Sequence, residues 1–383
     1  MSTARHPDGT MEVVAVGDIS LGDSWQGVGG GVHARFERIR GENRSYPFEH
    51  VTSLFQGAQI AFGNLETVLS HRGLVRRKAS SMEMRGHPGA AERLAAAGFT
   101  ALNVANNHMM QHGIGAFSET VESLRRHGMS VVGLADETHR GCIPQTVSAN
   151  GITATLLGFA FEKDKYAPGP VEYAFGPDCD IPGQVAAAKE RSDLVICSVH
   201  WGVEFVRHPS AAEEALGRSL VDAGADLVIG HHPHVARRVE RYGRGLIAYS
   251  LGNFVFDMLW NPWLRTGLVL RVRLSRNGVE HHETELVWIG DDYQPRPLSG
   301  EERGAAGAFD ALQQRPEWVA QDDQYTRHYE ELVARNRYES YGHFLRNTKH
   351  RPLSYTVQTV LRTARRKAAG MFSVKPALPS GHD

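Results

Sequence analysis

Short apolar runs, bounded by glycine, proline or polar residues, recur over the first three-quarters of the chain. Such runs are typical of buried β-strands. They predict strands over residues 12–16, 59–62, 99–104, 131–132, 153–161, 193–199, 226–229, 245–250, 268–274 and 282–289. Apolar residues at helical spacing, with proline near the start or glycine after the end, predict helices over 88–97, 115–127 and 211–223. Strands that alternate with helices in this way are typical of an α/β fold.

Two stretches depart from this alternation. Residues 168–182 contain four prolines and predict a loop over the fold, which is a candidate substrate lid. Beyond about residue 299 no further strand is predicted and the composition is charged and favours helix. We therefore expect a globular domain over residues 1–298 and a charged, basic helical extension over 299–383.

The C-terminal extension contains an amphipathic basic helix. Its apolar residues fall on one helical face: Leu353, Val357, Val360, Leu361 and Ala364. Residues 340–382 contain eight Lys or Arg and no Asp or Glu. Such a helix can lie on an anionic membrane as a peripheral element or dock a protein partner, although packing of one face on its own domain is the commoner arrangement. The extension has no recognised nucleic-acid motif and no aromatic stacking array, so nucleic acid is not the expected partner.

Composition excludes several classes of protein. Of the 383 residues, 41% are hydrophobic and 22% charged, which is ordinary for a globular chain. The net charge of -1 argues against a general affinity for nucleic acid or acidic lipid. Three cysteines without a CxxC pair argue against a disulfide framework and a thiolate zinc site. No secretory leader or apolar run of about 18 residues is visible, so a cytoplasmic location is expected.

Several predicted strands are followed directly by side chains that bind metals. They are Asp18, Glu66, Asn107 with His108, His200, and the run from Gly230 to His234. Because strand ends in α/β sheets lie side by side, these residues predict one shared site. Carboxylate, amide and imidazole groups together suit two divalent ions such as Mn, Fe or Zn. Taken singly, Asp18 can also cap a turn, and the histidine run can equally be a polar surface turn.

The same residues form an ordered series of motifs. It comprises Gly17-Asp18, Asn64-Leu65-Glu66, Asn106-Asn107-His108, His200-Trp201-Gly202-x-Glu204, Gly230-His231-His232-Pro233-His234 and Ser250-Leu251-Gly252-Asn253-Phe254. The series resembles that of the CapA family, capsule or poly-gamma-glutamate biosynthesis proteins of the calcineurin-like metallophosphoesterase superfamily. The resemblance runs from about Val13 to Asp257 and leaves the C-terminal extension uncovered. It implies a four-layer αββα sandwich, with two central sheets and helices outside.

The resemblance also implies roles for individual residues. Asp18 would bind the first metal and Glu66 would bridge the two ions. Asn107 and His200 would bind the second metal, and His108 would act as the acid that protonates the leaving group or stabilises the transition state. The histidine run would supply one ligand to each metal through His232 and His234.

The series departs from the family pattern in two places. The superfamily's first motif is Asp-x-His, whereas this chain has Ser20 in the histidine position. Many CapA proteins carry an acidic residue shortly after the asparagine–histidine pair, whereas Met109-Met110-Gln111 follows His108 here. Further candidates to support the ligands or contact substrate are Asn64, His231, Glu204 and Asn253.

Two functions are consistent with these features. The first is a metal-dependent, phosphoesterase-like hydrolase acting on a small molecule, a phosphoester or a glutamyl polymer, in synthesis or processing of a poly-gamma-glutamate-like or other anionic product. The second is a non-catalytic metal-binding component for capsule or polymer biosynthesis or export, because a fold does not fix a function.

Overall fold

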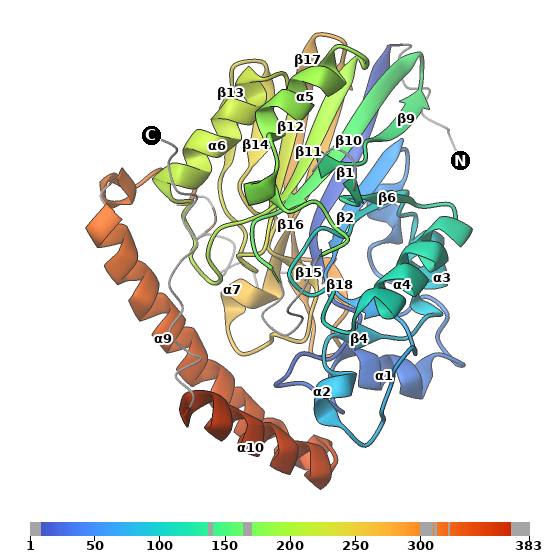
Figure 1. Cartoon of the computed structure of the whole chain (residues 1–383), viewed down its shortest axis with the longest axis vertical. Helices are drawn as coiled ribbons and strands as arrows, with labels where there is room; N and C mark the ends of the chain where they lie inside the picture. The colour runs from blue at the N-terminus through green and yellow to red at the C-terminus, as the bar shows by residue number, and fades with distance from the viewer. Residues whose placement is uncertain are drawn as a thin grey trace.

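Two large β-sheets form the centre of the molecule (Figure 1). The computed structural model describes residues 9–136, 141–163, 171–298, 309, 312–320 and 322–368. The first sheet is eight-stranded, in the order β18-β17-β16-β1-β2-β5-β6 with β15 paired to β1. Its strands are β1 (Thr10–Ile19), β2 (Ile60–Leu65), β5 (Ala101–Asn103), β6 (Ser130–Val132), β15 (Asn253–Val255), β16 (Thr266–Ser275), β17 (Gly278–Ile289) and β18 (Pro295–Pro297).

The second sheet is six-stranded, in the order β13-β14-β12-β11-β10-β9. Its strands are β9 (Gln145–Ala149), β10 (Ile152–Ala160), β11 (Leu194–His200), β12 (Leu227–His231), β13 (Val239–Tyr242) and β14 (Gly245–Ala248). In both sheets the central strands are parallel and the antiparallel partners lie toward the edges. The parallel strands therefore end at one side of each sheet, where ligands usually bind.

Helices cover the outer faces of both sheets. On the first sheet lie α1 (Val32–Ile39), α3 (Ala90–Ala97) and α4 (Ile114–Arg126), and on the second lie α5 (Ile181–Lys189) and α6 (Ala211–Asp222). Shorter elements are α2 (Ala79–Met82), α7 (Pro262–Arg265), the strand pairs β3 (Val68–Leu69) with β4 (Arg85–Gly86) and β7 (Ala135–Asp136) with β8 (Gly141–Cys142), and the 3-10 turns η1 (Thr52–Phe55) and η2 (Gly176–Asp178).

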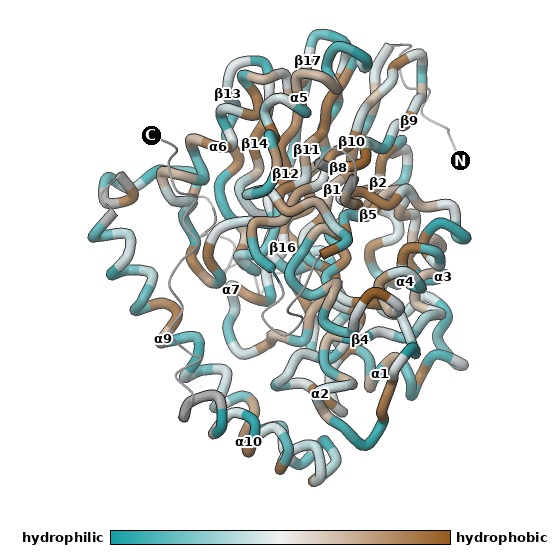
Figure 2. Tube along the Cα trace, in the orientation of Figure 1, coloured by the Kyte–Doolittle hydropathy of each residue, from teal (hydrophilic) through white to brown (hydrophobic). Residues whose placement is uncertain are grey.

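Alternation along β1 accounts for the layers. Met11, Val13 and Ala15 join a core packed between the two sheets, whereas Val14 and Val16 join the core beneath α1, α3 and α4. Successive side chains of a strand point to opposite faces, so one apolar run supplies two cores. A third core lies between the second sheet and α5 with α6. Three cores between four layers confirm the predicted αββα sandwich, and Figure 2 shows hydrophobic residues concentrated along the central strands.

The C-terminal extension is helical, as predicted. It contains η3 (Glu317–Ala320), α9 (Asp322–Asn347), η4 (Thr348–His350) and α10 (Leu353–Ala368), which run along the outside of the sandwich (Figure 1). Within the described part of the chain, no helix is both long enough and apolar enough to cross a bilayer.

The predicted strands and helices are all present, with bounds shifted by a few residues. The loop prediction for residues 168–182 is wrong at its end, because α5 begins at Ile181. The side chain of Asp180 caps this helix by accepting from the backbone N–H of Gly183 at 3.0 Å, and Pro182 occupies the first turn. Both are helix-start signals. The beginning of the proposed lid, residues 168–170, lies outside the described residues.

Candidate metal centre

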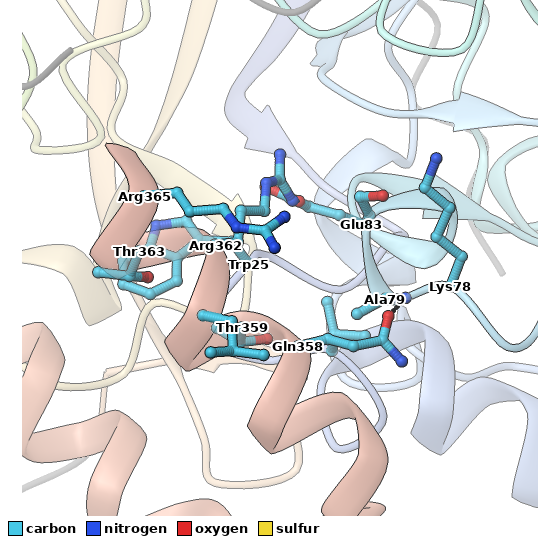
Figure 3. A pocket seen from close by; sticks show the side chains of 12 residues that line it. Trp25, Lys78, Ala79, Glu83, Gln358, Thr359, Arg362, Thr363 and Arg365 are labelled. Atoms are coloured by element: carbon cyan, nitrogen blue, oxygen red, sulfur yellow. Dashed lines mark hydrogen bonds and ion pairs between the residues drawn. The ribbon is translucent and has the colours of Figure 1, made fainter. Parts of the chain in front are cut away.

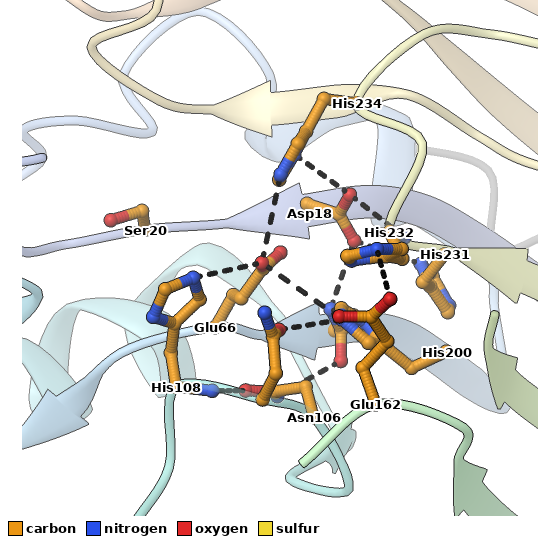
Figure 4. Close-up of polar contacts among 12 residues, drawn as sticks. Asp18, Ser20, Glu66, Asn106, His108, Glu162, His200, His231, His232 and His234 are labelled. Atoms are coloured by element: carbon orange, nitrogen blue, oxygen red, sulfur yellow. Dashed lines mark hydrogen bonds and ion pairs between the residues drawn. The ribbon is translucent and has the colours of Figure 1, made fainter. Parts of the chain in front are cut away.

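Strand ends from both sheets meet at one buried site (Figure 4). Near the end of β1 lies Asp18, and Glu66 directly follows β2, both in the first sheet. His200 ends β11 in the second sheet, and the histidine run follows from the end of β12. We call Asp18, Glu66, His200, His232 and His234 the strand-end cluster, and each is at most 2% exposed.

Glu66 lies at the centre of this cluster. Its Oε1 is 3.7 Å from Nε2 of His234, 3.8 Å from Nε2 of His108 and 4.0 Å from Nε2 of His200. Neither oxygen of Glu66 accepts a hydrogen bond from any described residue. A buried carboxylate without hydrogen bonds is costly unless another group, such as a cation, compensates it.

Asp18 has several partners. Its Oδ1 accepts from Nδ2 of Asn64 at 2.9 Å and lies 3.3 Å from Nδ1 of His231, while its Oδ2 lies 3.3 Å from Nδ1 of His234. Burial alone would raise the pKa of Asp18, but the hydrogen bonds and charges of His231 and His234 hold it well below its usual range. The Asp18 carboxylate is therefore ionised at neutral pH, as a metal ligand would need to be.

Charge couples the remaining groups of the cluster. Burial, together with the charges of Asp18 and Glu204, raises the pKa of Glu66 well above its usual range. Burial alone would lower the pKa of His234, but the charge of Glu66 and the hydrogen bond to Asp18 raise it to about 10. Burial and the neighbouring His232 lower the pKa of His200 well below its usual range. Protonation of Glu66 and of His234 is thus coupled through charge, and a bound cation would compete with these protons.

The histidine run has an unusual backbone. His232 and His234 have φ values of 96° and 58°, in the left-handed region that residues other than glycine rarely adopt. Such conformations persist only where the surrounding structure enforces them, and they concentrate at functional sites. Here the turn directs both rings toward the carboxylates of the first sheet (Figure 4).

The donor atoms fit divalent ions. One set, Glu66, His232 and His234, and a second, Asp18, Glu66 and His200, each bring their ligand atoms within 4.8 Å of one another. Ligands about 2.0–2.2 Å from a common ion lie about 3–3.5 Å apart, so small side-chain movements would complete either set. Both sets share Glu66, the residue expected to bridge. The first set contains both His232 and His234, which the family resemblance assigns to different ions.

Asparagines position the ligands. The amide oxygen of Asn64 accepts from Nδ2 of Asn103 at 2.9 Å and of Asn106 at 3.3 Å, which turns the Asn64 amide nitrogen toward Asp18. Asn253 Oδ1 lies 3.0 Å from Nδ1 of His234. An amide oxygen can only accept a hydrogen bond, so Nδ1 of His234 carries the donated N–H and Nε2 is the nitrogen left to bind an ion.

Asn107 was predicted to bind metal, and Glu204 to support the ligands or contact substrate. Asn107 Oδ1 lies 2.9 Å from Nε2 of His200, so these groups share a hydrogen bond at the position where both were expected to bind metal. Glu204 is half-buried and acts on Glu66 and His234 through its charge.

His108 lies at the open edge of the site. Its side chain is 20% exposed, whereas that of Glu66 is fully buried. Gln111 places its Oε1 3.1 Å from Nδ1 of His108, in the region where the family pattern has an acid. The amide of Gln111 therefore orients this ring, and Asn106 Oδ1 accepts from the backbone N–H of His108.

Ser20 contributes no ligand. Its Oγ donates to the carbonyl of Gly22 at 3.3 Å and lies 4.0 Å from Sδ of Met84. Figure 4 shows its side chain apart from the cluster.

Glu162 is a site residue that the sequence reasoning missed. Its Oε1 lies 4.0 Å from Nε2 of His232, and its side chain is 17% exposed. It follows β10 by two residues, and the strand over 153–161 was predicted. The rule that identified Asp18 and Glu66, a polar residue directly after a buried strand, therefore also points to Glu162.

The sequence profile described as "Bacterial capsule synthesis protein PGA_cap" matches residues 12–258. The chain belongs to this family. The match covers every residue of the strand-end cluster and confirms the resemblance to CapA proteins. The C-terminal helices α9 and α10 of this PGA_cap member lie outside it.

Curated relatives agree with this membership. "Capsule biosynthesis protein CapA" of Bacillus anthracis is 31% identical in an alignment of 283 positions, which covers 70% of this chain and 65% of that protein. "PGA biosynthesis protein CapA" of Bacillus subtilis (strain 168) is 31% identical over 260 residues, 66% of this chain and 67% of that protein. The PGA_cap member thus spans about two-thirds of the length of these relatives.

Solved structures align more distantly with this PGA_cap member. A putative 5'-nucleotidase from Staphylococcus aureus aligns with a TM-score of 0.44 and 12% identity, over 79% of this chain and 58% of that one. A hypothetical protein from Thermus thermophilus aligns with a TM-score of 0.43 and 14% identity, over 75% of this chain and all of that one.

Proposed function

We propose that this chain is a metal-dependent hydrolase of the CapA type, which cleaves a phosphoester or a glutamyl amide bond in the synthesis or processing of an anionic polymer. The observation that carries the proposal is the position of Glu66. Nε2 of His234 and Nε2 of His200 lie 3.7 and 4.0 Å from one oxygen of this buried carboxylate, beyond direct hydrogen-bonding distance. This spacing suits ligands of a shared ion better than hydrogen-bonded partners.

The residues divide into holding groups and a reacting group. Asp18, Glu66, His200, His232 and His234 would hold the metal. Divalent ions bound there would act as Lewis acids on a phosphoryl or carbonyl oxygen. His108 is more exposed than these ligands, so its ring can reach both the cluster and a substrate at the open edge.

His108 is the proposed proton donor to the leaving group. Gln111 fixes the ring through Nδ1, so Nε2 is the nitrogen that faces Glu66 and the site. A positioned imidazole that donates a proton contributes about 10²–10⁴-fold to a rate. The buried pairs Asn64–Asp18 and Asn253–His234 keep the holding groups in place during this transfer.

Hydrolysis by the full-length chain loaded with Mn, Fe or Zn tests the proposal. The substrates are a panel of phosphomonoesters, phosphodiesters and γ-glutamyl peptides. His108→Gln is expected to lower kcat about 10²–10⁴-fold with unchanged metal content. His127→Gln is the matched control, because among the described residues that ring forms its hydrogen bond with the carbonyl of Ser123, at the end of α4. Full activity of His108→Gln, or inactivity of the loaded chain on the whole panel, would refute the assignment.

A second function is favoured by Ser20 and Gln111, which stand where the family has a ligand and an acid. It is a non-catalytic, metal-binding component of polymer synthesis or export. Polymer production in cells separates the two functions. A cell carrying only His108→Gln produces polymer if the chain is a scaffold and fails to do so if the chain is the hydrolase.

A further inference from the structure

The apolar face of α10 is turned away from the protein. Leu353 is 76% exposed, Leu361 54%, Val360 50% and Val357 48%. These positions form one stripe along the helix, because side chains three or four residues apart share a face. A surface helix normally buries such a stripe against its own core. Helix α10 leaves this apolar stripe exposed and contacts its own domain through the opposite, polar face.

Polar contacts hold the opposite face of α10 on the domain. Gln358 accepts from the backbone N–H of Ala79 at 2.9 Å and donates to the carbonyl of Arg77 at 2.9 Å (Figure 3). Arg362 forms an ion pair with Glu83. Thr359, on the same side, is buried. These contacts fix the rotation of α10 about its axis. The apolar stripe, on the other side of the helix, is therefore exposed to solvent.

The seam between α10 and the domain is incompletely packed. A cavity of about 440 Å³ lies between the helix and the segment around α2, and Trp25, Lys78, Glu83 and Arg362 contribute to its lining. Among the described residues of α10, Tyr355 packs against the small apolar cluster of Val28 and its neighbours, and Leu361 lines the cavity from one margin of the stripe. Leu353, Val357 and Val360 do not line the cavity and are about half exposed or more.

The charged side chains of α10 itself, and of the residues just before it, are all cations. Arg346, Lys349 and Arg365 are exposed. No Asp or Glu occurs in residues 340–382, and Arg366 and Lys367 follow Arg365 in the sequence. The nearest acid before this stretch, Glu339, is paired with Arg335 at 3.0 Å.

We propose that α10 is a membrane-docking helix that lies in the interface of an anionic bilayer. Aliphatic side chains beside exposed cations are the composition of interfacial helices, whose apolar face enters the acyl boundary while the cations meet lipid phosphates. A protein partner of matching shape would need acids facing these cations, and the absence of acids in this stretch fits a uniform anionic surface. The polar contacts to Ala79 and Glu83 would keep the globular domain beside the membrane.

Co-sedimentation of the full chain with vesicles tests this inference. We expect binding to vesicles of phosphatidylcholine and phosphatidylglycerol in equal parts, weaker binding at high salt, and little binding to phosphatidylcholine alone. The double variant Val357→Gln, Leu361→Gln should lower the partition coefficient about tenfold or more. Arg365→Gln should lower it about fivefold on anionic vesicles only.

The matched control is Leu345→Gln, which removes a leucine of α9 that is more exposed (66%) than either residue of the double variant. It should bind vesicles as the unmodified chain does. An unchanged far-ultraviolet circular dichroism spectrum and Tm establish that each variant is folded. Absence of binding to anionic vesicles, or equal losses in the α10 and α9 variants, would overturn the proposal. Concentration-dependent dimerisation that the double variant abolishes, without vesicle binding, would assign the stripe to a second copy of the chain.

Discussion

The strand-end cluster and a second group, Glu37, His71 and His87, contain the same ligand types in different surroundings. Ligand atoms of the second group also approach within 4.8 Å, and Nε2 of His87 lies 3.7 Å from Oε1 of Glu37. We call this second group the surface cluster, because its members are partly exposed to solvent.

The two clusters differ in the hydrogen bonds that the histidine ring nitrogens already make. In the surface cluster, the backbone N–H of Gly89 donates to Nδ1 of His87 at 2.9 Å, so the ring proton lies on Nε2, the atom that faces Glu37. In the strand-end cluster, Asn253 Oδ1 engages Nδ1 of His234, which leaves Nε2 directed at Glu66. A distance between donors is thus insufficient to define a metal site, and the hydrogen bond on the other ring nitrogen decides which atom can bind.

The largest expected difference between the clusters comes from removing one carboxylate charge in each. Glu66→Gln should lower the affinity for Mn or Zn about a hundredfold or more, since a direct ligand matters more than its supports. The matched variant Glu37→Gln should leave affinity unchanged. Competition with a chromogenic chelator measures both constants. An equal loss of metal affinity in the two variants, or a larger loss for Glu37→Gln, would contradict the assignment of the metal site to the strand-end cluster.

A smaller loss of metal affinity is expected when the residue that positions His234 is changed. Asn253→Ala removes the acceptor at Nδ1 and should weaken metal affinity about 10–100-fold. It also removes the hydrogen bond from Nδ2 to the carbonyl of Leu264, at a cost of about 1–3 kcal/mol in the free energy of unfolding. Asn261→Ala, at the cap of α7, is the control. An affinity equal in both variants, measured by calorimetric titration, would show that Asn253 does not position the ligand.

The pH dependence of binding gives the smallest effect for a single step, that of one pH unit. In the metal-free chain the charge of Glu66 keeps His234 protonated up to about pH 10, so an ion must displace this proton. Affinity should therefore rise about tenfold per pH unit between pH 7 and 9. Burial lowers the pKa of His87 to about 4, so the surface cluster has no such proton to release. Calorimetry in two buffers of different ionisation enthalpy counts the protons, and a count of zero would exclude His234 as the ligand.

The sequence predicted the parts of the fold that depend on local periodicity. Apolar runs such as that around Val14 mark strands wherever they lie, and Gly98 or Gly224 mark helix ends. The convergence of Asp18 and His200 also followed, because parallel strands end at one side of a sheet. Helix α5 was missed, since its Asp180 cap lies within a proline-rich stretch that favours a loop.

The remaining features depend on contacts between distant segments. Gln111 bonds His108, and Asn103 turns the amide of Asn64, by side-chain geometry that spacing does not encode. The outward rotation of α10 depends on where the backbone of residues 76–79 presents its hydrogen-bonding groups. An amphipathic pattern predicts that a helix has an apolar face, but it does not predict whether that face points toward the protein or toward solvent.

Anomalous diffraction from crystals of the full chain grown with Mn or Zn tests the central claim most directly. We predict a peak within about 2.0–2.2 Å of a Glu66 oxygen, with His234 Nε2 among its ligands, and a second peak on the side of His200 if two ions bind. A peak at Glu37 and His87, with none between the strand ends, would contradict the account.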